Sequence, residues 1–212
     1  MQAILERTDR FLDRELDLKE RVLVIVAAAM LAAVYVFPLW TLTMYAPQYS
    51  DGLRMNIYSY KLQGGNRGQD IKEINLLNHY IGMKDLVAED FNEFKWMPFV
   101  VGAIGLLFLR TAVHGKMASL VDIIVLYGYF AAFSLWSFGY KLYSYGHNLA
   151  PTAAVKVPPF MPPMFGHRTL ANFEVYSYPA AASYALGLAI VLLVATFWLA
   201  WHDKPGRANR AG

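Results

Sequence analysis

The sequence predicts an all-α membrane protein: four transmembrane helices, an amphipathic N-terminal helix at the membrane interface and two long extracytoplasmic loops. Two observations support this fold class. Of the 212 residues, 57% are apolar and only 17% are charged, whereas soluble proteins are about a quarter charged. The apolar residues also gather in four segments, at about 22–45, 93–109, 117–140 and 179–201, and about 20 such residues span a bilayer as a helix. We therefore expect one membrane domain over residues 1–212.

The distribution of basic residues predicts the orientation. Of the 19 Lys and Arg residues, the denser set flanks the spans near both termini and in the link Arg110–Lys116. Segments that remain in the cytoplasm carry such an excess. We therefore expect a multi-pass protein of the bacterial inner membrane with both termini cytoplasmic, and with outer loops 46–92 and 141–178 in the periplasm.

The N-terminal elements follow from local patterns. Residues 3–20 place Leu5, Leu12 and Leu16 at helical spacing among charged residues. This predicts either an amphipathic helix on the inner membrane surface or a solvated helix that packs on a partner subunit. Pro38, near the outer end of the first span, is expected to kink that helix.

The first outer loop has local structure of its own. Alternation of Leu53, Met55 and Ile57 with polar residues predicts a short strand within 52–62. The glycines of 64–68 indicate a turn. Asp70 and Glu73 have capping-box spacing, so a helix is expected over about 71–80.

A candidate metal site lies in the outer loops. His79 and Met83 are four residues apart, and on a helix they would share a face. An imidazole and a thioether together suit Cu(I), a soft ion. His147 is the third candidate ligand, and Asn75, Asn78 and Tyr80 are expected to orient the ligands. Less favoured candidates follow in a proline-rich, extended stretch: Met161, Met164 and His167.

The sequence also allows metals other than copper. Zinc prefers a carboxylate to a thioether as its third ligand, and Glu73, Asp85 or Glu89 could supply it. The sequence has no cysteine, which excludes disulfides, thiolate metal sites and covalent c-type haem. A b-type haem between His79 and His147 is disfavoured because haem ligands usually lie within a span.

Three stretches carry a resemblance: LNHYIGM (77–83), YGHNLAPTAAVKVPPFMPP (145–163) and ANFEVYSYP (171–179). With the span layout, they resemble small four-span bacterial membrane proteins associated with copper handling and with loci for nitrous oxide reductase maturation. The resemblance covers about two thirds of the chain. It implies that His79, Met83 and His147 are the positions to carry over, and that Met161, Met164 and His167 are less typical.

The leading hypothesis is therefore a copper-binding accessory protein, or a copper-bearing subunit of a membrane or periplasmic copper enzyme. No nucleophile–base pair or nucleotide loop is visible, so the chain is not expected to be catalytic alone, and no catalytic residue is assigned. Expected partners are membrane lipid, other membrane subunits or a periplasmic copper protein. A net charge of +3 gives no reason to expect nucleic acid. The alternatives are a non-catalytic structural subunit of a respiratory or monooxygenase-type complex without its own metal, and a transporter, which would need an oligomer to enclose a path.

Overall fold

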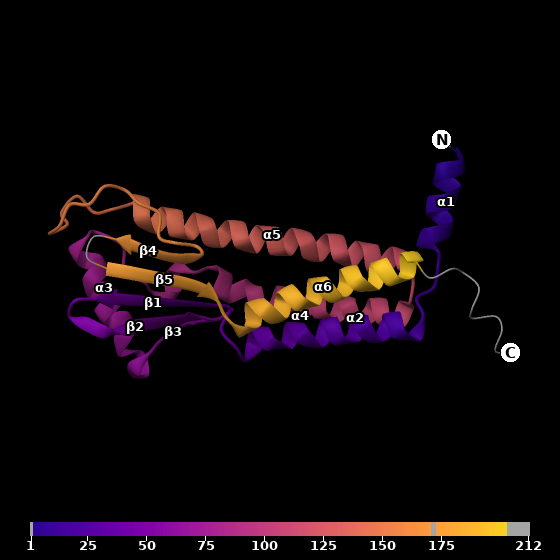
Figure 1. Ribbon diagram of the computed structural model, residues 1–212, viewed down its shortest axis with the longest axis horizontal. Helices are drawn as coiled ribbons and strands as arrows, with labels where there is room; N and C mark the ends of the chain where they lie inside the picture. Colours follow the sequence, from indigo (N-terminus) through magenta and orange to yellow (C-terminus); the bar gives the residue numbers. More distant parts are fainter. Residues whose placement is uncertain (1, 171–172, 203–212) are drawn as a thin grey trace. The chain divides into compact units, whose positions relative to one another are not determined.

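The computed structural model describes residues 2–170 and 173–202, and it divides into two compact units. The helical unit comprises residues 1–32, 101–130 and 185–212, and the sheet unit comprises residues 33–100 and 131–184. Both can be followed along the ribbon in Figure 1. In chain order the helices are α1 (Gln2–Leu12), α2 (Leu18–Leu31), α3 (Gln69–Tyr80), α4 (Glu93–His114), α5 (Met117–His147) and α6 (Ala181–His202), with the 3-10 helices η1 (Ala32–Tyr35), η2 (Asn66–Gly68) and η3 (Ala88–Asp90).

The sheet unit contains a five-stranded antiparallel sheet, so the prediction of an all-α protein is wrong. Its strands are β1 (Trp40–Ala46), β2 (Tyr49–Ile57), β3 (Leu62–Gly64), β4 (Gly166–Leu170) and β5 (Phe173–Pro179). Their order across the sheet is β3-β2-β1-β5-β4, visible in Figure 1. The protein is therefore of mixed α and β structure, with segments from both expected outer loops joined in one sheet.

The central strand β1 lies where the first transmembrane span was expected. The apolar run from residue 22 is helical only as far as η1; Pro38 follows, which lacks the N–H that a continuing helix needs. Beyond it, β1 pairs on one side with β2 and on the other with β5, as in Leu42 with Met55 and with Ser177. In a strand paired on both edges, the backbone N–H and C=O groups are hydrogen-bonded as fully as in a helix. An apolar run can therefore form either structure.

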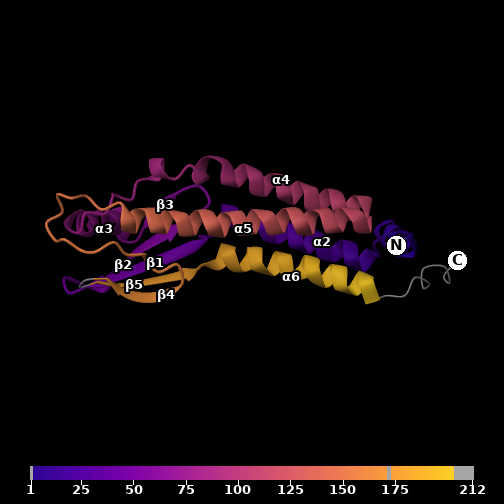
Figure 2. The same ribbon diagram turned by 90° about the horizontal axis from the view of Figure 1, so that it is seen from above.

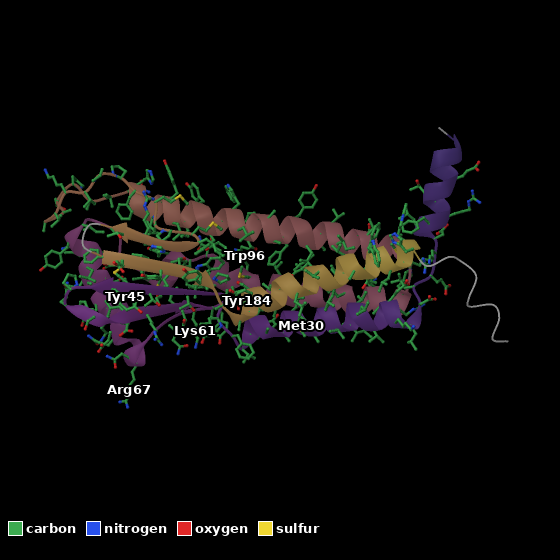
Figure 3. All side chains as sticks on the ribbon, viewed as in Figure 1. Met30, Tyr45, Lys61, Arg67, Trp96 and Tyr184 are labelled. Carbon is green, nitrogen blue, oxygen red and sulfur yellow. The ribbon has the colours of Figure 1, made fainter. Side chains whose placement is uncertain are left out.

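The local predictions for the first outer loop were largely confirmed. The expected strand is β2, in which Leu53 and Met55 are buried, and the expected helix is α3. The capping box was wrong: Gly68 precedes α3 with φ 91°, and the Asp70 carboxylate accepts a hydrogen bond from the backbone N–H of Arg54 (2.9 Å). Ile74 and Leu77 of α3 pack on the buried face of the sheet. Arg67, in the turn before α3, projects away from the ribbon in Figure 3.

Among the residues that the structure describes, three helices, α4, α5 and α6, are long and apolar enough to cross a membrane, so the chain is a multi-pass membrane protein. The expected second span extends further than predicted, because α4 continues to His114. Figure 2 shows α4 and α5 side by side, and in the helical unit the ring of Phe108 meets that of Tyr127 edge-on at 5.4 Å. α2, with 14 residues, is about 21 Å long at 1.5 Å per residue and is not among the three.

The N-terminal segment was predicted as one helix over 3–20 but is divided. Between α1 and α2, residues 14–16 run alongside the link from α4 to α5. The N–H of Leu16 donates to the carbonyl of Gly115 (2.6 Å), and the N–H of Met117 donates to the carbonyl of Arg14 (2.9 Å). This short pairing fixes the N-terminal segment to the end of the α4–α5 hairpin.

Candidate metal centre

His79 and Met83 lie at the end of α3, but the helical spacing that paired them does not reach Met83. The helix ends at Tyr80, and Gly82 adopts φ 78°. The N–H of Met83 then folds back onto the carbonyl of Asn78 (2.9 Å). As a result the His79 side chain is exposed, while Met83 is half-buried and lines a partly open cavity.

His147 is the last residue of α5 and is held by the helix turn before it. Its ring stacks on that of Tyr143 with centroids 3.7 Å apart. Its Nδ1 lies 3.0 Å from the carbonyl oxygen of Tyr143. A carbonyl accepts only, so Nδ1 carries the proton, and in the neutral ring Nε2 keeps its lone pair for a ligand. A carbonyl-oriented imidazole of this kind is the usual arrangement in metal-binding histidines.

Backbone hydrogen bonds join the chain at the end of α3 to the segment that follows α5. The N–H of Ala150 donates to the carbonyl of Gly82 (2.7 Å), and the N–H of Val155 donates to that of Tyr80 (2.9 Å). The two segments are so close that a Cβ on Gly82 would lie 2.9 Å from the carbonyl oxygen of Ala150. We call residues 79–83 and 147–150 the outer junction. It contains all three favoured ligands, His79, Met83 and His147, in two short segments from different parts of the chain.

The less favoured candidates have contacts along β4 and β5 instead. His167, on β4, is exposed and stacks on Tyr176 with ring centroids 5.4 Å apart. The carbonyl of Met161 accepts a hydrogen bond from Arg168 (3.1 Å). That of Met164 accepts one from the Ser177 hydroxyl (3.1 Å). These contacts hold the proline-rich stretch against the sheet.

The carboxylates considered for zinc have other contacts. Glu73 accepts hydrogen bonds from the Tyr49 hydroxyl and from Gln69 (2.8 Å), and these bonds lower the pKa of the Glu73 carboxyl. Asp85 and Glu89 are exposed. Within residues 2–170 and 173–202, no three side chains of His, Asp or Glu form a group that could hold a metal ion.

The expected orienting residues help to shape the segment around Met83. The Asn75 side chain accepts a hydrogen bond from the N–H of Leu86 (2.8 Å) and so fixes the chain after Met83. Asn78 is 2% exposed, and its carbonyl receives the N–H of Met83. Tyr80 contributes its carbonyl to the outer junction, while its side chain is exposed.

The sequence analysis did not identify the cavity beside Met83. This cavity of about 90 Å³ lies in the sheet unit, and Met44 of β1 and Met55 of β2 line it together with Met83. Met44 and Met55 share a face of the sheet because Leu42 pairs with Met55 and Met44 with Leu53. The period-two spacing of Leu42 and Met44, and of Leu53 and Met55, was the available signal. For Met44 it was hidden within a segment predicted to be a membrane helix.

Comparison of the chain with protein-family models, with curated proteins and with solved structures found no match.

Proposed function

We propose that this chain binds copper on the extracytoplasmic side of the bacterial inner membrane, as an accessory protein or as a copper-bearing subunit of a membrane or periplasmic copper enzyme. His79, Met83 and His147 are the proposed ligands. The observation that carries the proposal is the outer junction, where the hydrogen bond from Ala150 to Gly82 (2.7 Å) joins the two ligand-bearing segments.

The ligand types favour copper over other metals. Two imidazoles and a thioether form a borderline-to-soft set that suits Cu(I), whereas Mg²⁺ and Ca²⁺ require oxygen ligands. When the His147 ring is neutral, an Nδ1–H bound to the Tyr143 carbonyl leaves Nε2 free to bind a metal. The glycine in the junction lets the two segments approach, and no larger residue fits there without displacement.

The length of α5 supports a position outside the bilayer for the outer junction. Its 31 residues extend about 46 Å at 1.5 Å per residue, whereas the hydrocarbon core of a bilayer is about 30 Å thick. Trp136 and Tyr140, about 20 residues from the start of α5, are more than 60% exposed and stack on each other. Trp96 and Tyr184 (Figure 3) lie near the sheet-unit ends of α4 and α6. Exposed Trp and Tyr are typical of the membrane–water interface, so His147 lies beyond it.

The orientation follows from charge. The link between α4 and α5 is basic, with Arg110 and Lys116, and residues 14–16 pair with this link. The N-terminal segment therefore lies on the side of the link, and the positive-inside rule makes that side cytoplasmic. The C-terminal tail, whose basic residues lie outside the described residues, follows α6.

The test is a Cu(I) titration of the purified protein against a chromophoric Cu(I) chelator. We expect His79→Ala and His147→Ala each to lose binding, because each removes one of three ligands. His167→Ala is the matched control and should keep wild-type affinity, since its ring is engaged with Tyr176 on β4. Equal affinities for all four proteins would refute the ligand assignment.

A second candidate function is that of a structural subunit of a larger membrane complex. An exposed aromatic row on α5 favours it: Phe133, Trp136, Tyr140 and Tyr143, each at least 47% exposed. Their 3-4-3 spacing is that of a helix–helix seam. Changing Trp136 and Tyr140 to Leu keeps this face apolar but removes the rings. If the row holds a partner subunit, native mass spectrometry of the protein extracted with its lipids will show dissociation of the complex.

A further inference from the structure

Three methionines from separate elements line the cavity of about 90 Å³ in the sheet unit. Met44 comes from β1, Met55 from β2 and Met83 from the segment after α3. Phe138 and Leu142 of α5 also line it, and the rest of the lining is mainly aliphatic and aromatic. Met55 is 4% exposed, so at least one of these thioethers is well shielded from solvent.

The cavity is partly open and is not an enclosed void of the core. Methionine is the side chain best able to close an irregular gap, because it is unbranched and flexible. Here three methionines border a cavity that stays open, so a ligand can enter it.

The residues that line the cavity determine which kind of ligand it can bind. The lining is overwhelmingly apolar, so it offers too little to hold a hydrated divalent ion or a water cluster, which needs several polar partners. Thioether sulfur is a soft ligand that suits Cu(I). Three polar side chains line the cavity: Asn78, Lys141 and Tyr145. Lys141 donates to the carbonyl of Asp90 (2.7 Å) and Tyr145 donates to that of Asp85 (3.3 Å). Both therefore have partners of their own.

We infer that this cavity is a second soft-metal site, in which Met44, Met55 and Met83 bind Cu(I) through their sulfur atoms. The inference rests on the proposed function, because Met83 belongs both to this trio and to the outer junction. Met83 is shared by the two sites. The ion can therefore pass from the exposed histidines to the three methionines. Copper thus enters at His79 and His147 and is then held by the three sulfurs.

The experiment uses the full chain in detergent, labelled with ¹³C in the methionine methyl groups, and titrates it with Ag(I), a redox-inert probe for Cu(I). We expect the methyl resonances of Met44, Met55 and Met83 to shift together, with uptake of a second equivalent of silver. Met117, which is fully buried in the helical unit, is the internal control and should not move. Met44→Leu and Met55→Leu preserve volume and should each abolish uptake of the second equivalent.

The outcomes separate the two proposals. If the resonances of Met44 and Met55 stay unchanged at saturating Ag(I), the methionines are core packing and this inference is overturned. If Met83 alone shifts in that experiment, and its shift is lost in His79→Ala, the outer junction stands by itself. If the methionine trio shifts equally in wild type and in the double variant His79→Ala, His147→Ala, the cavity site stands and the junction ligands are refuted. If no methyl group moves and no silver is taken up, both proposals fail.

Discussion

At the scale of single residues, Gly82 determines whether the outer junction can form. Its φ of 78° lies in the left-handed region, and a Cβ there would lie 2.9 Å from both the Ala150 oxygen and the Ala153 Cβ. Gly82→Ala therefore forces alanine into a left-handed backbone conformation, at a cost of about 1 kcal/mol. It also displaces the segment that follows α5. We expect it to lower both the melting temperature and the copper affinity.

Gly68 provides the matched control for this substitution. It has φ 91°, but a Cβ there meets no atom of the described residues within 4 Å. Gly68→Ala should therefore lower stability only through its left-handed backbone conformation, and its copper affinity should equal that of the wild type. Thermal unfolding and Cu(I) competition on both variants check this. If Gly68→Ala impairs copper binding as much as Gly82→Ala, the close approach at the junction has no special role.

Ser177 satisfies two polar groups at once inside the sheet unit. Its hydroxyl accepts a hydrogen bond from the indole N–H of Trp40 (2.8 Å) and donates to the carbonyl of Met164 (3.1 Å). Ser177 is fully buried and Trp40 is 7% exposed. Ser177→Ala leaves the indole N–H unpaired, which costs about 1–3 kcal/mol. Melting temperatures in detergent should fall accordingly, while alanine at the exposed Ser50 should leave them unchanged.

At the scale of elements, the Glu73 carboxylate of α3 accepts hydrogen bonds from Tyr49 of β2 and from Gln69 of α3. The hydrogen bond from Tyr49, with a smaller contribution from Gln69, lowers the pKa of the Glu73 carboxyl. A carboxyl whose pKa is lower in the folded state stabilises the fold above its unfolded pKa, and this contribution is lost as the pH falls through the folded pKa. The bond between β2 and α3 should therefore weaken in acid, below the ordinary pKa of 4.5.

Tyr49→Phe tests this directly. It removes the hydroxyl and keeps the ring, so the variant should unfold at a lower temperature than wild type near neutral pH. The difference between the two proteins should shrink as the pH falls below about 4.5, the ordinary carboxyl pKa. A difference that stays constant across that range would show that the Glu73 charge is not involved.

The elements also show what could be predicted from sequence and why the rest could not. Alternation of Leu53 and Met55 predicted β2, because one face of that strand is buried and the other is exposed. β1 was missed because it follows the apolar end of α2 without a polar break, so hydropathy alone extends the helix. β5 has the same period-two pattern in Val175 and Ser177, but its residues pair with β1 residues 129 to 139 positions away, and local patterns do not reveal such pairings.

Some features of the candidate site could likewise be predicted from the sequence, and others could not. Residue chemistry made His79, Met83 and His147 the candidate ligands, because a chain without cysteine has few soft ligands to offer, and this assignment stays a prediction. Their proximity to the same junction depends on the hydrogen bond between Gly82 and Ala150, which no local pattern predicts. Met44 and Met55 were not candidates, because a methionine within an apolar run is usually packing.

At the scale of the whole molecule, the orientation is open to a labelling test, since the chain has no cysteine of its own. Single cysteines at Arg67, in the sheet unit, and at Glu15, whose side chain is 81% exposed in the helical unit, report on the two sides. In intact spheroplasts a membrane-impermeant maleimide should label Arg67→Cys only. Glu15→Cys should react after lysis. The reverse pattern would place the outer junction in the cytoplasm.

The central claim is that the full chain carries copper on its outer side, and elemental analysis of the detergent-purified protein tests it most directly. An absorption spectrum of the same sample distinguishes copper from haem. The proposal predicts near-stoichiometric copper and no Soret band, with the copper lost in His79→Ala. A protein that holds no copper, even after loading with Cu(I) under reducing conditions, would contradict it.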